Sequence, residues 1–484
     1  MQWTVQLDTA SDIPLYRQLY EYFAGLLRSG KLTSGDRLPA TRELAGMLGL
    51  NRATVNAAYE LLQAEGLISQ HVGRGTFITN GFGSAGPDWS ALLMRPETLL
   101  WPPAPAPAAM SFASSRPDER LFPLEQFHAA CREVLAGAGL REILQLGPTT
   151  GYEPLRRRLE ETAPAGRDGA VMITNGCQQS LDLIARALVR PGDVVAIEDP
   201  VYPGLKNLFA QAGARLAGVP VGATGMDVES LGRALERGGV RLVVVTSNFQ
   251  NPTGATLPLP ARRELLRLAA AAGAVVVEND IYGELRYTGD PIPPLKQLDP
   301  GNVVLVRSFS KIAFPGLRVG WLCGPRPLVG RLAELKQLAD LHTDQFAQAV
   351  LLRLIECGAL AAHLGRVVAA GAQRLAAALD ACQKHLPRAA RFTRPQGGMN
   401  LWVELPGPLD AGELLPRAER EGVAYLPGKY FAVSHPAAGA LRLSFAALEP
   451  ELIRKGIETL GAIFSREFER VETARGSQPA PAMV

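Results

Sequence analysis

The sequence predicts a multidomain protein: a small, mostly α-helical N-terminal domain, followed by a larger α/β domain with a central, mostly parallel sheet. Three observations support this fold class. The 484 residues exceed the length of one typical domain. Helical patterns and two short β-like runs occupy residues 1–80, whereas strand-like runs alternate with amphipathic helices over residues 108–470. Between them, residues 81–107 form a Pro-, Ala- and Gly-rich linker, and residues 471–484 have the composition of a disordered tail.

The overall composition is that of an ordinary globular protein, with 47% hydrophobic and 20% charged residues. The formal net charge of +3 does not indicate a nucleic-acid partner, so such a partner depends on where the basic residues lie. Five cysteines lack metal-ligand spacing, and their odd number without a secretory signal indicates reduced thiols in a cytoplasm. The apolar runs are too short to span a bilayer. We therefore expect a cytoplasmic protein with no metal site and no membrane contact.

The N-terminal domain begins with apolar residues that recur at helical spacing and predict a first helix: Leu15, Leu19, Tyr22, Phe23, Leu26 and Leu27. A second helix is expected from about Arg42 to Leu48, with Gly49 suited to its C-terminal end. Asn51 can then cap a third helix that runs to about Ala64. Two helices joined by a tight, Gly-containing turn form a helix-turn-helix, in which the start of the second helix reaches base edges.

The run GLISQHVGRGTFIT then predicts a β-hairpin whose Gly73-Arg74-Gly75 tip projects one cation, as a wing entering a DNA groove would. A helical docking domain with solvated arginines is the plainer alternative. However, PLYRQLYEYFAGLLRSGKLTSGDRLPATRELAGMLGLNRATVNAAYELLQAEGLI and the following GRGTFI closely resemble the GntR-family winged-helix domain. Ala40 departs from the family, which often has a capping Ser there. The resemblance implies double-stranded DNA as a partner, with contacts from Arg42, Asn51, Arg52, Thr54 and, in the wing, Arg74.

The second domain contains Val-rich runs separated by helices: AVMIT, DVVAIE, RLVVVTS, AVVVEN and NVVLVRS. Such runs imply a parallel sheet covered on both faces. SFSKIAFPGLRVGW places Lys311 directly after the last of these strands, beside Ser308, Ser310 and Arg318. A lysine held rigidly at a strand end can form a Schiff base with an aldehyde cofactor, while hydroxyls and a guanidinium hold its phosphate.

Several other motifs stand at strand ends, in the order TNGCQQSLDL, EDPVYPG, NPTG, ENDIYGEL and LRLSFA. Together with SFSKIAFPGLR they make the region from about Met110 to Ile463 resemble the fold-type I pyridoxal 5′-phosphate (PLP) enzymes, the aspartate aminotransferase superfamily. The resemblance implies PLP on Lys311. The phosphate of PLP would be held by Ser308, Arg318 and the backbone N–H groups of Cys177 and Gln178. Tyr202 would stack on the ring, and Asn251 and Tyr282 would contact its phenolic oxygen. Arg442 would bind the α-carboxylate of a substrate.

Two residues depart from that family. In that family an Asp three residues before the tyrosine pairs with the pyridine nitrogen of PLP. Three residues before Tyr282 this sequence has Asn279, with Asp280 next to it. The sequence leaves open which of these two residues faces the nitrogen. Leu146 stands where the family often offers a tyrosine to the partner subunit's phosphate. Both changes suggest a domain that binds PLP and amines better than it turns them over.

The order of the two domains resembles the MocR-like subfamily of bacterial regulators and implies a head-to-tail homodimer. We expect a PLP-dependent transcriptional regulator that senses an amino acid or amine through Schiff-base chemistry. The main alternative is a working aminotransferase with an accessory DNA-binding domain. Further alternatives are a protein that senses PLP without any amine, and a PLP fold that has lost its cofactor.

Overall fold

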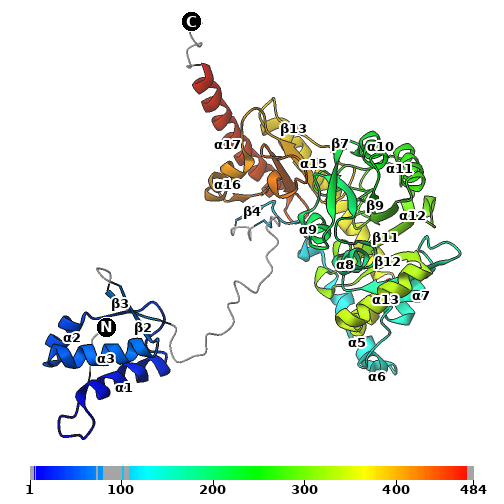
Figure 1. Cartoon of the computed structure of the whole chain (residues 1–484). Helices are drawn as coiled ribbons and strands as arrows, with labels where there is room; N and C mark the ends of the chain where they lie inside the picture. Colours follow the sequence, from blue (N-terminus) through cyan, green and yellow to red (C-terminus); the bar gives the residue numbers. More distant parts are fainter. Residues whose placement is uncertain (1–4, 6, 72–74, 80–100, 103–107, 477–484) are drawn as a thin grey trace. The chain divides into compact units, whose positions relative to one another are not determined.

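The computed structural model describes residues 5, 7–71, 75–79, 101–102 and 108–476, which form two compact units, 1–97 and 98–484 (Figure 1). Most of the predicted linker at 81–107 lies outside the described residues, as does Arg74 at the predicted wing tip. Each unit is described by itself.

The N-terminal unit contains the predicted helices and hairpin. Helices α1 (Leu15–Arg28), α2 (Thr41–Leu48) and α3 (Arg52–Ala64) pack around a shared core that includes Leu19, Phe23, Leu44, Tyr59 and Leu62. Strands β1 (Arg37–Leu38), β2 (Ile68–His71) and β3 (Gly75–Ile78) form an antiparallel sheet in the order β1-β3-β2. The apolar periodicity thus predicted the correct buried faces.

The turn between α2 and α3 has the predicted chemistry. Gly49 ends α2 with a φ of 65°, a left-handed conformation that favours glycine. Asn51 caps α3, because its Oδ1 accepts a hydrogen bond of 2.9 Å from the Ala53 N–H. Ala40 stands at the cap of α2 without a side-chain hydrogen bond, as expected from its departure from the family pattern.

The C-terminal unit is built on a large sheet in the order β5-β12-β11-β10-β9-β6-β7-β8. The five Val-rich runs are all strands of this sheet: β5 (Gly169–Thr174), β6 (Val194–Asp199), β9 (Val240–Val245), β10 (Val275–Asn279) and β11 (Val303–Ser308). Strands β6, β7 (Arg215–Gly222), β9, β10 and β11 run parallel, whereas β8 (Gly225–Met226) and β12 (Gly320–Pro325) are antiparallel to their neighbours.

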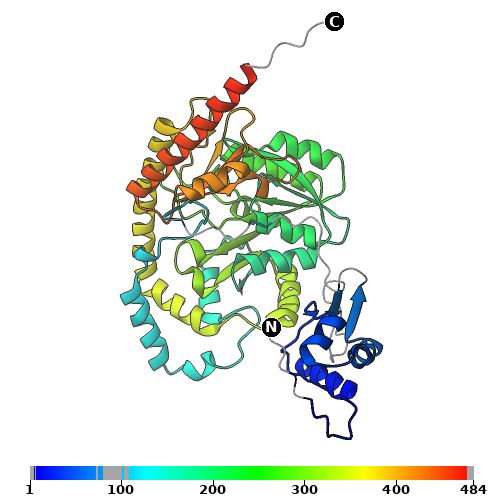
Figure 2. The ribbon, with the colours of Figure 1, turned by 90° about the vertical axis from the view of Figure 1, so that its left-hand side faces the viewer.

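Helices cover both faces of this sheet (Figures 1 and 2). One face packs against α8 (Cys177–Leu188), α9 (Pro203–Gln211) and α13 (Arg326–Asp340). The other face packs against α7 (Glu153–Glu160), α10 (Val228–Glu236), α11 (Leu259–Ala271), α12 (Leu295–Leu298) and α14 (Gln345–Glu356). Beside α14 lies α5 (Leu124–Ala136), followed by the short α6 (Leu140–Ile143). This is the expected α/β arrangement, and it brings the carboxyl ends of the parallel strands to one edge.

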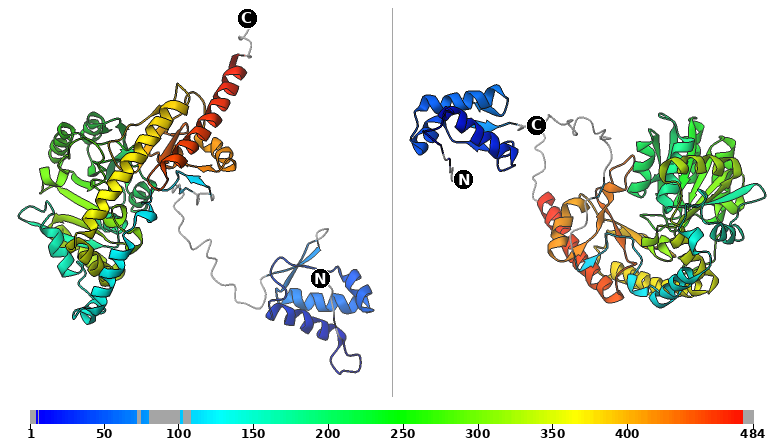
Figure 3. Two further views of the ribbon diagram at one scale, coloured as in Figure 1. Left: turned by 180° about the vertical axis from the view of Figure 1, so that it is seen from behind. Right: turned by 90° about the horizontal axis from the view of Figure 1, so that it is seen from below.

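A smaller sheet in the order β13-β14-β17-β16 completes the unit: β13 (Arg391–Phe392), β14 (Asn400–Glu404), β17 (Ala440–Ser444) and β16 (Leu426–Pro427). It packs against α15 (Ala359–His385), α16 (Ala411–Arg420) and α17 (Pro450–Gly476), with α15 and α17 side by side (Figures 2 and 3). Strand β4 (Met110–Ser111) pairs with β15 (Val423–Ala424) beside this layer.

The prediction of a disordered tail from residue 471 was wrong for residues 471–476, because α17 continues to Gly476. Helix-favouring residues carry the pattern up to Gly476, and proline first recurs at Pro479. The remaining tail residues, 477–484, lie outside the described part. No single described helix is long and apolar enough to cross a bilayer; α14 and α15 reach that length only as a pair bent by 80°.

Candidate functional site

Lys311 lies at the carboxyl edge of the large sheet. Strand β11 ends at Ser308, and a 3-10 turn, Phe309–Lys311, carries the lysine beyond it. The Lys311 Nζ donates a hydrogen bond of 2.6 Å to the Ser115 carbonyl and lies 5.9 Å from the centre of the Tyr282 ring. The pKa of Lys311 is lowered to about 8, mainly by burial and also by the nearby charges of Arg442 and Arg318, while Cys177 acts in the opposite direction. The amine therefore has an appreciable neutral, nucleophilic fraction near neutral pH.

The start of α8 forms a cradle of backbone N–H groups next to Lys311. The first N–H groups of a helix lack partners within it, which suits them to an anion; here they belong to Cys177 and Gln178. Gly176, with a φ of 80°, precedes them. A Cβ on Gly320 would lie 2.8 Å from the Cys177 nitrogen, and one on Gly176 would lie 2.6 Å from an Arg318 nitrogen. The approach of Gly320 to the Cys177 backbone therefore requires glycine, whereas at Gly176 the positive φ favours it.

Hydroxyl groups and a guanidinium lie beside this cradle. The Ser308 Oγ donates to the Ser310 Oγ at 3.0 Å and accepts from the Ser310 N–H at 3.1 Å. Arg318 has a φ of 54°, and its Nη2 donates to the Asn175 carbonyl at 3.3 Å. The cradle thus combines neutral and charged donors of the kind that bind phosphate.

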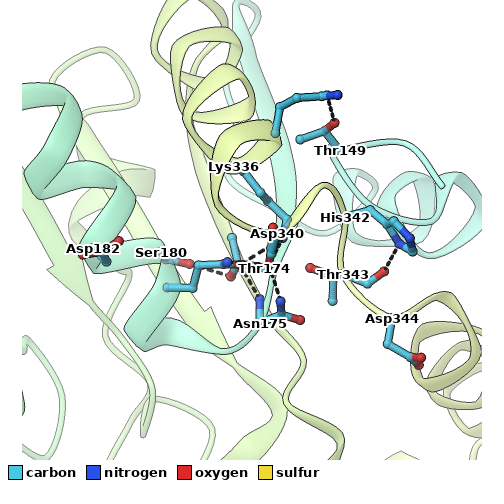
Figure 4. A network of polar contacts seen from close by, with 12 residues as sticks. Thr149, Thr174, Asn175, Ser180, Asp182, Lys336, Asp340, His342, Thr343 and Asp344 are labelled. Atoms are coloured by element: carbon cyan, nitrogen blue, oxygen red, sulfur yellow. Dashed lines mark hydrogen bonds and ion pairs between the residues drawn. The ribbon is translucent and has the colours of Figure 1, made fainter. Parts of the chain in front are cut away.

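A network of polar contacts joins the cradle at the start of α8 to the end of α13 (Figure 4). The Asp340 carboxylate at the end of α13 accepts hydrogen bonds from Asn175, from Gln179 at 2.6 Å and from the buried Lys336 at 2.6 and 2.7 Å. Thr174 and Ser180 join their hydroxyls at 2.7 Å on the adjoining turn. Sequence reasoning missed this network, because its members come from helices far apart in the chain.

Arg442, Asn251 and Tyr282 are brought together as predicted. The Asn251 Nδ2 donates to the Tyr282 Oη at 3.5 Å, and the Arg442 Nη1 donates to the Asn251 Oδ1 at 3.1 Å. The Arg442 Nη2 donates to the Ala113 carbonyl at 2.5 Å. Arg442 is only 4% exposed, and within the described residues it has no acidic partner. Burial lowers its pKa to about 10, and a carboxylate ligand would supply the opposite charge that the buried guanidinium lacks.

The structure separates Asn279 from Asp280. Asn279 pairs with Val306, and both lie on the face that carries Val277 and Val304, so Asn279 shares its face with Ser308. Its Nδ2 donates to the Thr246 Oγ1 at 3.5 Å, while its Oδ1 is buried without a partner among the described residues.

The Asp280 side chain lies on the opposite face, where both of its carboxylate oxygens accept hydrogen bonds from protein groups. Its carboxylate accepts from Asn248 at 2.8 Å and from Arg307 at 2.7 and 3.0 Å. The inclusion of Asp280 among the cofactor-binding residues is therefore corrected, because strand alternation places adjacent side chains on opposite faces. Of the two residues, Asn279 is the one that shares its sheet face with Ser308.

Tyr202 lies at the start of α9, near the cradle. Its ring contacts Gly204 so closely that a Cβ there would lie 2.5 Å from a ring carbon, and the Gln178 side chain donates to the Gly204 carbonyl at 3.4 Å. Its side chain is 41% exposed. An aromatic face next to the phosphate cradle is suited to stacking on a flat ligand.

Sequence reasoning also missed Ser115 and Asn400. The Ser115 Oγ donates to the Asn400 Oδ1 at 2.5 Å, and the Ser115 carbonyl is the acceptor for Lys311. The available signal was a polar residue in the buried run Asn400–Glu404. No local pattern indicated Ser115.

The predicted DNA-contacting residues lie in the helix-turn-helix. Arg42 and Arg52 are exposed on the first turns of α2 and α3, and Thr54 is half-buried on α3. Asn51 is exposed, but its side-chain oxygen is used in capping α3. The exposed arginines are available for phosphates or base edges.

Two families match this chain along its length. Residues 15–78 match the bacterial regulatory proteins of the gntR family, and residues 114–460 match aminotransferase class I and II. The chain is 30% identical over 478 residues to the probable rhizopine catabolism regulatory protein MocR of Rhizobium meliloti, with 95% of both chains covered. This chain belongs to the MocR-like regulators of the GntR family.

Proteins named as aminotransferases are also similar to the MocR-like chain. The 2-aminoadipate transaminase of Thermus thermophilus is 38% identical over 360 residues, which cover 73% of this chain and 90% of the transaminase. A crystal structure of Pyrococcus horikoshii kynurenine aminotransferase superposes with a TM-score of 0.73 and 33% identity, covering 78% of this chain and 96% of that one. The predicted family, the fold-type I fold and PLP as cofactor are thereby confirmed.

The geometry of this MocR-like regulator fits that cofactor. The cradle offers a helix N-terminus, hydroxyls and a guanidinium to a phosphate, and its glycines allow close approach. Lys311 offers an amine with a lowered pKa to an aldehyde. The unpartnered Asn279 Oδ1 offers an acceptor to a protonated ring nitrogen.

Proposed function

We propose that this MocR-like regulator senses an amino acid or amine at PLP held by Lys311, and that residues 110–115 transmit the signal toward the DNA-binding domain. When bound, PLP supplies an aldehyde that reacts reversibly with amino groups. The remaining site residues would position PLP. Its phosphate would be bound by Ser308, Ser310, Arg318 and the N–H groups of Cys177 and Gln178. Tyr202 would lie against the ring face, Asn251 and Tyr282 would contact the phenolic oxygen, and Asn279 the ring nitrogen.

The observation that supports this proposal is the pair of hydrogen bonds to residues 113 and 115. Lys311 donates to the Ser115 carbonyl and Arg442 to the Ala113 carbonyl. A ligand amine at Lys311 and a ligand carboxylate at Arg442 compete with both carbonyls, so this segment must change partners when a ligand binds. The same segment follows the predicted linker directly in the chain, through β4. A coupling of about 1–3 kcal/mol is the range expected for such a switch.

On the DNA side, we infer that Arg42, Asn51, Arg52 and Thr54 contact the operator in the major groove, and that Arg74 does so in the wing. A dimer would present two such units to paired half-sites, whose spacing its geometry must match. Because the DNA partner is in the cytoplasm of a bacterium, we expect the protein to act there.

The dimer itself is supported by exposed leucines beside the cradle. Leu338 is 80% exposed and Leu146 is 72% exposed. Thr149, three residues after Leu146, donates a hydrogen bond of 2.7 Å to Gln337, which precedes Leu338 on α13. Large apolar side chains as exposed as these two are suited to burial in a subunit interface. We expect Leu338→Asp to shift the protein toward monomer in light scattering; an unchanged dimer would place the interface elsewhere.

The regulator proposal is tested with an operator selected from a random DNA pool and measured by fluorescence anisotropy. A panel of amino acids and amines should include at least one that shifts both the visible absorption of the holo-protein and its affinity for DNA. Lys311→Ala should bind DNA with unchanged basal affinity and lose the ligand response. If the DNA affinity of that variant still changed with the ligand, the proposed mechanism would be contradicted.

A second candidate function is transamination. The lowered pKa of Lys311 and the open carboxylate position at Arg442 favour it, whereas the neutral Asn279 opposes it because an amide stabilises a pyridinium poorly. Sustained multiple turnovers with an amino acid and a 2-oxo acid would make catalysis primary. Sensing of PLP alone would instead show as a difference in DNA affinity between apo- and holo-protein without any amine.

A further inference from the structure

Asn400 is a buried polar residue that the roles described above do not use. It begins β14, is 1% exposed and precedes the buried Leu401, Trp402 and Val403. Its Oδ1 accepts a hydrogen bond of 2.5 Å from the Ser115 Oγ. Its Nδ2 has no hydrogen-bond partner in the described part of the chain. A buried donor without a partner is unfavourable for folding, so a leucine or phenylalanine at this position would give a more favourable free energy of folding.

The amide of Asn400 lies on the same side of the small sheet as Arg442. In the β14–β17 ladder, Trp402 is paired with Arg442. Asn400 is two residues before Trp402, so it shares that face and is the diagonal neighbour of Arg442. Asn400 also lies near the Tyr282 hydroxyl and lowers the pKa of that phenol, although burial raises the pKa overall, but its Nδ2 makes no hydrogen bond to it within the described residues. The free Nδ2 therefore belongs to the same site as Arg442 and Lys311.

The groups around Asn400 are almost all hydrogen-bond donors. Lys311 and Arg442 donate to main-chain carbonyls, and Asn251 donates to Tyr282. Within the described residues no acidic side chain forms an ion pair with Lys311 or Arg442. The Arg442 Nε and the Asn400 Nδ2 are both buried donors without partners. A cluster of donors with two unpartnered members is suited to an anionic oxygen from a ligand.

A carboxylate fits this requirement better than a single ring oxygen. The ring oxygen already has Asn251 and Tyr282 as partners in the proposed function. A carboxylate has two oxygens that can accept about four hydrogen bonds. Arg442 cannot supply them all, because its Nη1 is directed to Asn251 at 3.1 Å. A further donor on the same face is what the second carboxylate oxygen needs.

We propose that Asn400 is a ligand-binding residue whose Nδ2 donates to the carboxylate of a bound amino acid beside Arg442. Ser115 holds the amide in this orientation. Asn400 thereby makes the site select amino acids over the corresponding amines that lack a carboxyl group. This inference rests on the proposed function, and it specifies the class of effector: an amino acid, not a simple amine.

The test compares matched pairs of ligands on the holo-protein. L-alanine is compared with ethylamine, and L-phenylalanine with phenethylamine, by titration of the visible absorption. Asn400→Leu should weaken binding of the amino acids by about tenfold and leave the amines within about twofold, as expected for one hydrogen bond to a charged group. Asn400→Asp preserves the shape but places a carboxylate next to the ligand carboxylate. It should weaken amino-acid binding by about a hundredfold or more and invert the preference toward amines.

A control variant separates this role from loosening of the strand pair. Ser444 is the cross-strand partner of Asn400, and its Oγ donates to the Met399 carbonyl at 3.1 Å. Ser444→Ala should leave the ratio of amino-acid to amine affinity unchanged. Equal losses for both ligand classes in Asn400→Leu would overturn the proposal, and so would a weaker PLP affinity of the apo-protein with an unchanged ratio.

A ligand without an amino group tests Asn400 independently of Lys311. Propanoate should raise the thermal stability of the Lys311→Ala variant, and the same stabilisation should require about tenfold more propanoate when Asn400→Leu is added. If no amino compound changes the spectrum of the wild-type holo-protein but propanoate behaves as stated, the proposed sensing function fails while the role of Asn400 stands. If propanoate stabilises both variants equally, Asn400 does not bind the carboxylate.

Discussion

The two faces of the large sheet differ at its carboxyl edge. On the face opposite Ser308, Asp280 is paired with Arg307 and Asn248, and the fully buried Arg262 with the carbonyls of Leu257, Pro293 and Ser247 and with Asn248. The Glu198 Oε1 on that face has no partner among the described residues. On the other face the Asn279 Oδ1 has no partner among the described residues, and neither do the Asn400 Nδ2 and the Arg442 Nε on the small sheet beside the site. Paired groups stabilise the fold, whereas the unpartnered groups around Lys311 are placed to take their partners from a ligand.

The largest expected effect tests the paired face. Asp280→Ala leaves the Arg307 guanidinium without its carboxylate, and Asp280 itself is buried. We expect the free energy of unfolding to fall by about 3 kcal/mol, as when one partner of a buried pair is removed. Urea unfolding of the full chain measures it. Asn279→Ala, one residue away on the other face, should cost less than about 1 kcal/mol; equal losses would contradict the difference between the faces.

The next effect concerns Arg442 on the site side. Lysine cannot reproduce the two parallel N–H donors of a guanidinium. Arg442→Lys should therefore weaken binding of amino acids by about 10- to 100-fold, with little change for simple amines. Calorimetric or spectral titration of the holo-protein measures both affinities. Arg391→Lys, a change at an 85% exposed side chain, is the matched control. Loss of amine binding to the same extent would show that Arg442 does not select the carboxyl group.

A smaller gain is expected from Asn279→Asp. The new carboxylate would share the site face with Ser308 and pair with a protonated ring nitrogen, which makes the ring a better electron sink. We expect the multiple-turnover transamination rate to rise by about tenfold, equivalent to about 1.4 kcal/mol in the barrier. An unchanged rate would mean that Asn279 does not face the ring nitrogen.

The smallest effect is the pH dependence of cofactor loading. Only the neutral amine of Lys311 attacks an aldehyde, and its pKa is lowered from 10.5 to about 8 mainly by burial. The rate at which apo-protein takes up PLP should rise about tenfold per pH unit below pH 8 and level off above it. Removal of a neighbouring charge in Arg442→Met should move this midpoint upward. A midpoint near 10 in the wild type would show that Lys311 is solvated and not held as described.

The same shift affects stability, with a sign that can be checked. Between pH 8 and 10.5 the unfolded chain holds a proton on Lys311 that the folded chain has released. The free energy of unfolding of the apo-protein therefore contains a contribution that increases with pH across this window. Below pH 8 both states are protonated, and the desolvation of the charged amine opposes folding. Lys311→Met should remove this pH dependence.

The sequence alone determined the features that depend on neighbouring residues. The cap at Asn51, the left-handed Gly49 and the Val-rich strands all follow from local conformational preferences and apolar periodicity, which act over a few residues. The motif resemblances then placed Lys311, Asn251, Tyr282 and Arg442, and the structure brings these residues together.

Only the tertiary structure decided which polar groups meet. Strand register, not composition, placed Asn279 on the site face and Asp280 with Arg307 on the other. Contacts across the chain joined Ser115 to both Lys311 and Asn400, more than 190 residues away in each case. No local pattern records such contacts, because they arise from how whole elements pack and which buried atoms remain without partners.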